Sequence, residues 1–258
     1  MRFGLCIDLG SIAAAEKAGF DYVEPPVANL LPDKPDQDFA PVAQAAKDSS
    51  LKPEAFNCFI PGSMKITGPE ANLNALRQYV GVAAARAAAL GGKVIVFGSG
   101  GARSVPDGFP ADKAMAQMDA FLNAIAPIAE EAGIIIVIEP LRKAECNIIN
   151  FVKEGLALAR KANKPSIRAL ADLYHVGQGN EPYENTAAAG PMLAHVHIAH
   201  PVHRKCPMPG DGFDYKPFFR ALKQAKYDTR ISLECGWDNL AVQGPVSLAY
   251  QRAEWVNA

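Results

Sequence analysis

Short runs of branched apolar residues recur along the chain and alternate with longer stretches whose apolar positions follow helical spacing. In residues 134–138, five isoleucines and valines stand together, and Glu139 and Pro140 follow them directly. A short, wholly apolar, β-branched run predicts a strand that is buried on both faces, as in a parallel sheet. Pro140 has no N–H for a strand ladder, so the strand is expected to stop there. Glu139 is therefore predicted at the carboxyl end of a buried strand.

The same reading along the whole chain predicts eight strands and eight helices in strict alternation. The strands are expected at 3–7, 21–24, 53–59, 93–97, 134–138, 167–171, 193–198 and 230–233. The helices are expected at 11–18, 39–49, 69–90, 111–132, 148–162, 182–189, 215–225 and 242–256. Such alternation implies parallel strands joined by crossover helices. In 258 residues it predicts an α/β chain that folds as a single (β/α)8 barrel over residues 1–258.

An open, doubly wound sheet is the alternative architecture. It would require a glycine-rich phosphate motif after the first strand, and residues 8–11 read Asp-Leu-Gly-Ser instead. The glycine-rich segment 98–101 comes too late to serve as that motif, and we expect it to be a flexible loop.

Composition narrows the class of protein. The chain is 49% hydrophobic and 21% charged, which is ordinary for a globular protein with a large core. A formal net charge of −1 gives no electrostatic footprint for nucleic acid or an anionic membrane, and no apolar run reaches the length of a membrane span. The N-terminal residues meet a charge too soon for a signal peptide. Five scattered cysteines predict reduced thiols and a cytoplasmic protein.

Polar residues close four consecutive predicted strands. Glu139 ends the fifth strand, Asp172 the sixth, His197 lies near the end of the seventh, and Glu234 ends the eighth. In a (β/α)8 barrel these ends meet at one rim, where active sites of this fold are found. Three carboxylates that converge without a cation would repel one another, so a divalent metal is expected between them. Three oxygen donors and one imidazole suit Mn²⁺, Mg²⁺ or Co²⁺, and Zn²⁺ is compatible.

All five histidines lie between residues 175 and 203. We expect His195 to pack in the barrel interior beneath the site, and His200 to be an exposed loop residue. His175 and the His203–Arg204 pair are expected to project from loops over the mouth of the barrel, where they can hydrogen-bond substrate hydroxyls.

These segments resemble the xylose isomerase-like TIM barrel family of sugar isomerases and epimerases. The resemblance rests on the segments 139–147, 172–175, 195–198 and 232–234, and its pattern is similar to that of the ketose 3-epimerases related to tagatose and psicose epimerase. It implies that Glu139, Asp172, His197 and Glu234 bind one metal, usually Mn²⁺, and that Glu139 and Glu234 also move protons. It further implies that Glu145, His175 and Arg204 contact the first three oxygens of the sugar.

The function implied is a metal-dependent epimerase or isomerase of a sugar or sugar phosphate. A hydroxypyruvate isomerase or another aldose–ketose isomerase is the first alternative, because two glutamates permit either reaction. A DNA-repair endonuclease of the same superfamily and a non-catalytic sugar-binding barrel are further alternatives. We expect a small sugar as the partner, with no nucleic acid and no membrane. A homodimer or homotetramer is compatible with the sequence, which does not determine the oligomeric state.

Overall fold

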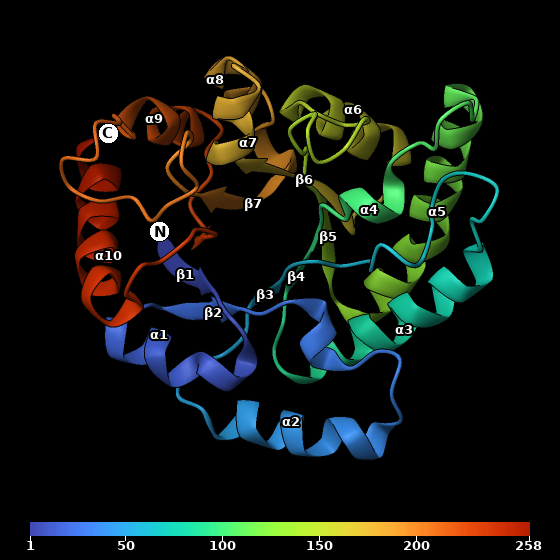
Figure 1. Ribbon diagram of the computed structural model, residues 1–258, viewed down its shortest axis with the longest axis horizontal. Coiled ribbons are helices and arrows are strands. Elements are labelled where there is room, and N and C mark those ends of the chain that lie inside the picture. The colour runs from blue at the N-terminus through green and yellow to red at the C-terminus, as the bar shows by residue number, and fades with distance from the viewer.

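The computed structural model describes residues 1–258 and shows eight parallel strands in a nearly closed barrel (Figure 1). The strands are β1 (Arg2–Cys6), β2 (Tyr22–Glu24), β3 (Ala55–Phe56), β4 (Val94–Phe97), β5 (Ile135–Ile138), β6 (Ile167–Asp172), β7 (Leu193–Ile198) and β8 (Arg230–Leu233). Their order is β2-β1-β8-β7-β6-β5-β4-β3. Between β2 and β3 the ladder is reduced to the isolated bridges Val23–Pro53 and Pro26–Asn57, which complete the ring. The predicted (β/α)8 barrel is confirmed.

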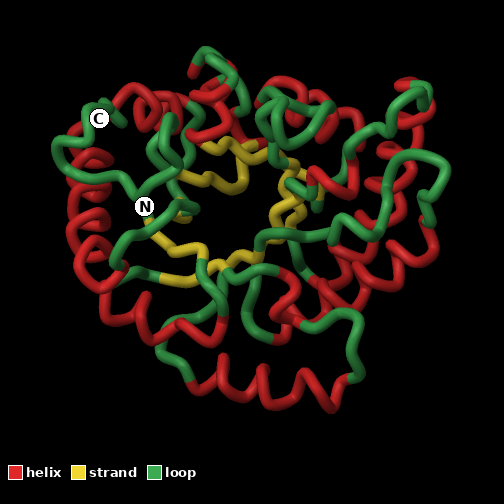
Figure 2. The backbone as a smooth tube through the Cα atoms, in the orientation of Figure 1, coloured by secondary structure: helices red, strands yellow, loops and turns green.

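Helices surround this ring on the outside (Figure 2). The α-helices are α1 (Ile12–Ala18), α2 (Asp36–Asp48), α3 (Leu73–Ala89), α4 (Gly100–Arg103), α5 (Ala111–Ala132), α6 (Val152–Ala162), α7 (Leu173–Gln178), α8 (Tyr183–Ala187), α9 (Lys216–Gln224) and α10 (Leu240–Asn257). Three short 3₁₀ helices are η1 (Leu9–Ser11), η2 (Val27–Leu30) and η3 (Gly190–Met192). None of these helices combines the length and the apolar character needed to cross a membrane.

The third strand and the segment after the fourth strand differ from the prediction, and α7 is a further helix that the prediction did not contain. The strand expected at 53–59 is reduced to Ala55–Phe56, because the flanking residues pair with β2 through single bridges instead of a ladder. The segment 98–101, expected to be a flexible loop, instead begins the short helix α4. The carbonyl of Ser99 accepts hydrogen bonds from the N–H groups of Ala102 and Arg103, and its side chain accepts one from Ile60. These bonds order the segment.

The core has an inner and an outer part, as the alternation of side chains on a strand requires. Inside the barrel pack Tyr22, Ala55, Val94, Val96, Val137 and Leu170. Outward-facing strand residues such as Ile231 and Leu233 pack against the surrounding helices, in contact with side chains such as Phe218. Burial on both faces explains why these strands read as continuous apolar runs.

Strand β7 breaks the alternation at one point. Its pairing with β6 shifts register between Ala169 and Leu170, whose partners are Leu193 and His195, so that Ala194 is an extra residue. Leu193 faces the helices, whereas Ala194 packs against the inner core. A bulge of this kind bends a strand and re-aims the side chains beyond it.

Gly4 gives a test of the packing inside the barrel. A Cβ added at Gly4 would lie 2.2 Å from Cζ of Tyr22, in the middle of the inner core. We expect Gly4→Ala to lower the free energy of unfolding by about 1–3 kcal/mol through overpacking, measured by denaturant titration. Gly81→Ala in α3 is the matched control, since its Cβ would meet no atom within 4 Å. It should instead stabilise the protein by about 0.5–1 kcal/mol. Equal effects of the two substitutions would contradict this account.

Candidate active site

The structure brings the four predicted metal-ligating residues together at the carboxyl ends of the strands. One ligand atom each of Glu139, Asp172, His197 and Glu234 lies within 4.8 Å of the others. The first three side chains are buried, and that of Glu234 is 21% exposed. The group is thus reached from the mouth of the barrel on the Glu234 side.

The backbone around Glu139 is held by a buried arginine. Arg103 lies in α4 with its side chain fully buried, and its guanidinium donates to the carbonyls of Phe97 (3.0 Å) and Glu139 (2.7 Å). The ends of β4 and β5 are thereby tied together. Gly98 leaves room for the carboxylate, because a Cβ there would lie 2.3 Å from Oε2 of Glu139. The direction of the Glu139 carboxylate is thus fixed by Pro140, which ends the strand, and by Gly98 and Arg103.

Burial of several carboxylates in one place shifts their pKa values. Burial, reinforced by the charges of Glu234 and Glu139, raises the pKa of Asp172 to about 8. The pKa of Glu234 is also raised, by burial and by the charge of Glu139. Burial acts against ionisation of Glu139 as well, but its hydrogen bond to His197 and the charge of that ring lower its pKa. The site therefore lacks positive charge for its number of carboxylates.

Two atoms, Oδ2 of Asp172 and Nδ1 of His197, indicate what kind of ligand would supply the missing positive charge. Oδ1 of Asp172 accepts a hydrogen bond from the N–H of Tyr174 (2.9 Å), whereas Oδ2 is buried without any partner. Nδ1 of His197 lies 3.0 Å from Oε1 of Glu139 and 3.7 Å from Oε2 of Glu234. An unpaired buried oxygen and an imidazole nitrogen among carboxylates fit a divalent cation with three oxygen ligands and one nitrogen ligand.

The predicted substrate-contacting residues lie over this group at the mouth. Arg204 donates to Oε2 of Glu234 (2.7 Å) and to Oε1 of Glu145 (3.4 Å). The guanidinium of Arg142 donates to the same oxygen of Glu145 (2.6 Å). Both guanidinium groups lie over the ring of Tyr174, at 4.7 Å for Arg204 and 5.3 Å for Arg142. Cation–π contacts and ion pairs thus form a layer of alternating charge above the carboxylates.

His175 lies between the group of carboxylates and the charged residues at the mouth. Its Nδ1 accepts a hydrogen bond from the backbone N–H of Arg142 (3.1 Å), so the ring proton is on Nε2. Nε2 lies 3.5 Å from Oδ2 of Asp172 and 4.0 Å from Oε2 of Glu145. Burial lowers the pKa of His175 to about 4, so the ring is neutral near pH 7 and offers one N–H toward the site.

One residue that the sequence reading did not select lies beneath the group. Glu24, the last residue of β2, is fully buried, and its two oxygens lie 2.7 Å from Nε2 of His197 and 2.7 Å from Nε2 of His195. Ser232 also donates to Glu24. A signal was present, because Glu24 closes an apolar strand directly before a proline, as Glu139 does.

Comparison with known proteins identifies the family of this barrel. Residues 12–258 match the family described as xylose isomerase-like TIM barrel. The chain belongs to this family. The family assignment predicted from the sequence is thereby confirmed.

Relatives in the family act on ketoses by name. The chain is 35% identical over 116 residues to the L-ribulose 3-epimerase of Methylomonas sp. (strain DH-1), a match that covers 45% of this chain and 40% of that protein. It is 25% identical over 237 residues to the D-psicose 3-epimerase of Agrobacterium fabrum, covering 86% of this chain and 77% of that one. The crystal structure of D-allulose 3-epimerase from Methylomonas sp. in complex with D-allulose superposes with a TM-score of 0.84 at 23% identity, over 98% of this chain and 97% of that one. The last likeness concerns the fold.

Within this family barrel, two histidine placements predicted from the sequence are wrong. His175 does not project from a loop: it lies in α7 and is buried, because Asp172 caps that helix and continues the strand directly into it. His200 is buried, not exposed. Its Nδ1 accepts hydrogen bonds from the N–H groups of Val202 and His203, and its ring stacks on that of His203 at 5.0 Å. The turn closed by these hydrogen bonds places the His200 side chain in the protein interior.

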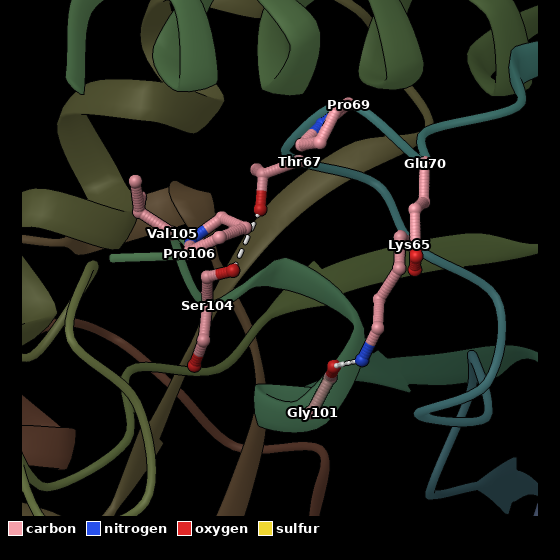
Figure 3. A pocket seen from close by; sticks show the side chains of 8 residues that line it. All are labelled: Lys65, Thr67, Pro69, Glu70, Gly101, Ser104, Val105 and Pro106. Atoms are coloured by element: carbon pink, nitrogen blue, oxygen red, sulfur yellow. Dashed lines mark hydrogen bonds between the residues drawn. The ribbon is translucent and has the colours of Figure 1, made fainter. Parts of the chain in front are cut away.

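A separate cavity lies between the segments 65–70 and 101–106 (Figure 3). Its volume is about 410 Å³. Lys65 donates to the carbonyl of Gly101 on one side of it, and Thr67 donates to the carbonyl of Ser104 on the other. None of the predicted site residues lines this cavity.

The carboxylate group predicts how the protein responds to a chelator. A cation that binds only the folded state stabilises it by about 3 kcal/mol at a hundredfold excess over its dissociation constant, so EDTA should lower the melting temperature and Mn²⁺ should restore it. In EDTA at pH 8, Asp172→Asn should melt a few degrees above wild type, because the asparagine neither buries a charge nor takes up a proton on folding. With Mn²⁺ the order should reverse. Calorimetry measures both.

The effect of Asp172→Asn should also depend on pH. Because the folded-state pKa of Asp172 is raised to about 8, the metal-free wild type loses stability as pH rises from about 4 toward 8. The advantage of the asparagine should therefore vanish near pH 4. Asp238→Asn, which alters an exposed carboxylate paired with Lys205, is the control and should show no such reversal with Mn²⁺. An Asp172→Asn variant that melts below wild type in EDTA at pH 8 would refute the repulsion argument.

Proposed function

We propose that this chain is a divalent-metal-dependent ketose 3-epimerase, an enzyme that inverts the configuration at C3 of a sugar or sugar phosphate. The observation that carries the proposal is the pair of glutamates, Glu139 and Glu234, at the ends of β5 and β8 with one candidate metal site between them. The named activities of the relatives support an isomerase of this kind. The metal we propose is Mn²⁺, held by Glu139, Asp172, His197 and Glu234.

Epimerisation at C3 requires removal of a proton beside the C2 carbonyl and its return from the opposite face. Strands β6 and β7 separate β5 from β8 in the ring, so Glu139 and Glu234 approach the same space from different sides. One carboxylate takes the proton and the other acid returns it. Since the reaction runs in both directions, each glutamate serves as base in one direction and as acid in the other. When bound, the metal supplies the positive charge that polarises the carbonyl and hydroxyl oxygens.

The residues of the mouth would hold the sugar in place. His175 offers its Nε2–H beside Asp172, and Arg204 and Glu145 offer a donor and an acceptor within 3.4 Å of each other. These groups match the carbonyl and hydroxyl oxygens at C1 to C3 of a ketose. An aldose–ketose isomerase would need proton transfer on one face alone, for which one of the two glutamates suffices, whereas epimerisation uses both.

The test is solvent-proton exchange across a panel of free and phosphorylated ketoses in D₂O, followed by NMR. With Mn²⁺ present we expect deuterium to enter C3 of the true substrate as its epimer appears, and EDTA to stop both. Uptake at C1 with formation of an aldose would replace this proposal by the isomerase alternative. Absence of uptake with every sugar, together with binding of a sugar, would favour a non-catalytic barrel. A homodimer or homotetramer and a cytoplasmic location stay predictions of the sequence.

Replacing either glutamate by glutamine should remove proton transfer. Glu139→Gln and Glu234→Gln should each lower kcat by on the order of 10²- to 10⁴-fold, because an amide neither takes nor returns the proton. Circular dichroism should show the same folded barrel. Glu184→Gln in α8 replaces an exposed glutamate outside the candidate metal group and should turn over as wild type does. Near-native exchange rates in either site variant would remove that residue from the mechanism.

Substitutions at the mouth should affect sugar binding and leave metal binding intact. His175→Ala and Arg204→Ala should each lower kcat/KM by about 10- to 100-fold, as expected for loss of a hydrogen bond that involves a charged partner. Lys205→Ala, at an exposed neighbour of Arg204, is the control. Metal content is measured by elemental analysis in each protein. Loss of metal from His175→Ala would show that His175 is a ligand and not a substrate contact.

A further inference from the structure

The carboxylate of Glu24 lies on the side of His197 that faces away from the proposed metal centre, on which the following inference rests. Oε1 of Glu24 is 2.7 Å from Nε2 of His197, and Oε2 is 2.7 Å from Nε2 of His195. Both rings and the carboxylate are fully buried. With one oxygen 2.7 Å from each ring nitrogen, the Glu24 carboxylate is placed to accept a hydrogen bond from both rings.

The contact with Glu24 decides which nitrogen of His197 faces the other carboxylates. A ring that donates from Nε2 to a carboxylate keeps its lone pair on Nδ1 when it is neutral. Nδ1 is the atom that lies 3.0 Å from Glu139 and 3.7 Å from Glu234. The nitrogen available to a metal and the nitrogen bound to Glu24 are therefore opposite ends of the same ring.

Glu24 is itself held rigidly from the neighbouring strands. Ser232 of β8 donates to Oε2 of Glu24, and the hydroxyl of Tyr22 lies 2.8 Å from that of Ser232. Gly4 of β1 pairs with both Tyr22 and Ser232, and its lack of a side chain leaves the space that these groups occupy. The carboxylate can thus cross the barrel interior from β2 to β7.

His195 belongs to the same hydrogen-bonded network as Glu24. Nε2 of His195 is taken by Glu24, while its Nδ1 is buried without a partner. Its ring therefore offers the site no ligand atom, and Nε2, which also lies 3.4 Å from Oγ of Ser232, is held within the network around Glu24.

We propose that Glu24 is the positioning residue of the metal centre: it fixes His197 as the Nε2–H tautomer, with Nδ1 directed at the metal. Partners of this kind fix the orientation of a ligating ring and raise its basicity, and their loss usually weakens metal binding by about 10- to 100-fold. Glutamine at position 24 would keep one acceptor and present an amide N–H₂ to the second ring. One of the two rings would then have to change tautomer or turn.

The experiment is a Co²⁺ titration of the metal-free protein followed by its visible absorption, without sugar. Glu24→Gln should bind Co²⁺ about 10- to 100-fold more weakly than wild type, with an altered cobalt spectrum. Tyr22→Phe is the matched control: it removes a buried hydroxyl from the same network but leaves both bonds from Glu24 to the rings. It should lower the melting temperature and leave the Co²⁺ affinity within about twofold of wild type, because both bonds from Glu24 to the rings remain.

A double-substitution cycle separates positioning from a general structural role. In a His197→Ala background, adding Glu24→Gln should leave the residual Co²⁺ affinity unchanged, because the ring through which Glu24 acts is gone. An equal loss in both backgrounds would overturn the inference, and so would a Glu24→Gln protein that binds Co²⁺ as wild type does.

A measurement on the wild type covers the case in which Glu24→Gln does not fold. Long-range ¹H–¹⁵N spectra of histidine-labelled protein report the tautomer of each ring, and His197 is assigned by comparison with His197→Ala. With metal bound we expect its proton on Nε2, and a proton on Nδ1 would overturn the inference. Wild type that binds no Co²⁺ would refute the proposed metal centre itself, which is a different result from a metal centre that ignores Glu24.

Discussion

Carboxylates that share a buried space repel one another, and the upper half of this barrel is arranged around that repulsion. The charge among Glu139, Asp172 and Glu234 is met from three directions. Arg103 lies fully buried behind the backbone of Glu139, Arg204 reaches Glu234 from the mouth, and His197 stands between the carboxylates. None of these groups forms a hydrogen bond with the second oxygen of Asp172. The protein thus neutralises most of the negative charge of the three carboxylates and leaves one buried oxygen of Asp172 without a hydrogen bond.

The groups beneath the three carboxylates and the groups above them differ in rigidity. The floor consists of Glu24, Ser232 and the two histidines of β7, all buried and mutually hydrogen-bonded. The rim consists of Arg204 and other long side chains that are about one-third exposed and rest on one aromatic ring. A buried hydrogen-bonded network resists rearrangement, whereas exposed ion pairs rearrange at small cost. Under the proposed function, the floor would set the geometry of a bound metal, and adaptation to a particular sugar would belong to the rim.

The fold could be predicted from the sequence because its signals are local. An apolar run that ends in Glu139 and Pro140 needs no distant partner to be recognised as a buried strand. The convergence of four strand ends follows from the topology alone. The role of Glu24 could not be predicted, because it depends on contacts between residues far apart in the sequence: Glu24 and His197 are 173 positions apart. The Glu-Pro pair at the end of β2 indicates a functional residue only once the closed barrel brings β2 opposite β7. The burial of His200 and the helix at Gly100 likewise come from tertiary hydrogen bonds that no periodicity encodes.

The extra residue in β7 has a consequence for how this gene can change. Leu193 faces the helices, so an unbroken alternation would turn His195 and His197 outward and Val196 inward; the bulge at Ala194 reverses that parity. Removing the codon for Ala194 would restore a regular ladder with both histidines still facing inward. Removing the codon for Val196 would instead turn His197 outward, and the site would lose its only candidate nitrogen ligand while every side chain of the site was still encoded. Loops above the barrel can lengthen or shorten at little cost. The spacing of residues in this strand beyond the bulge, in contrast, is as much a part of the site as the identity of its histidines.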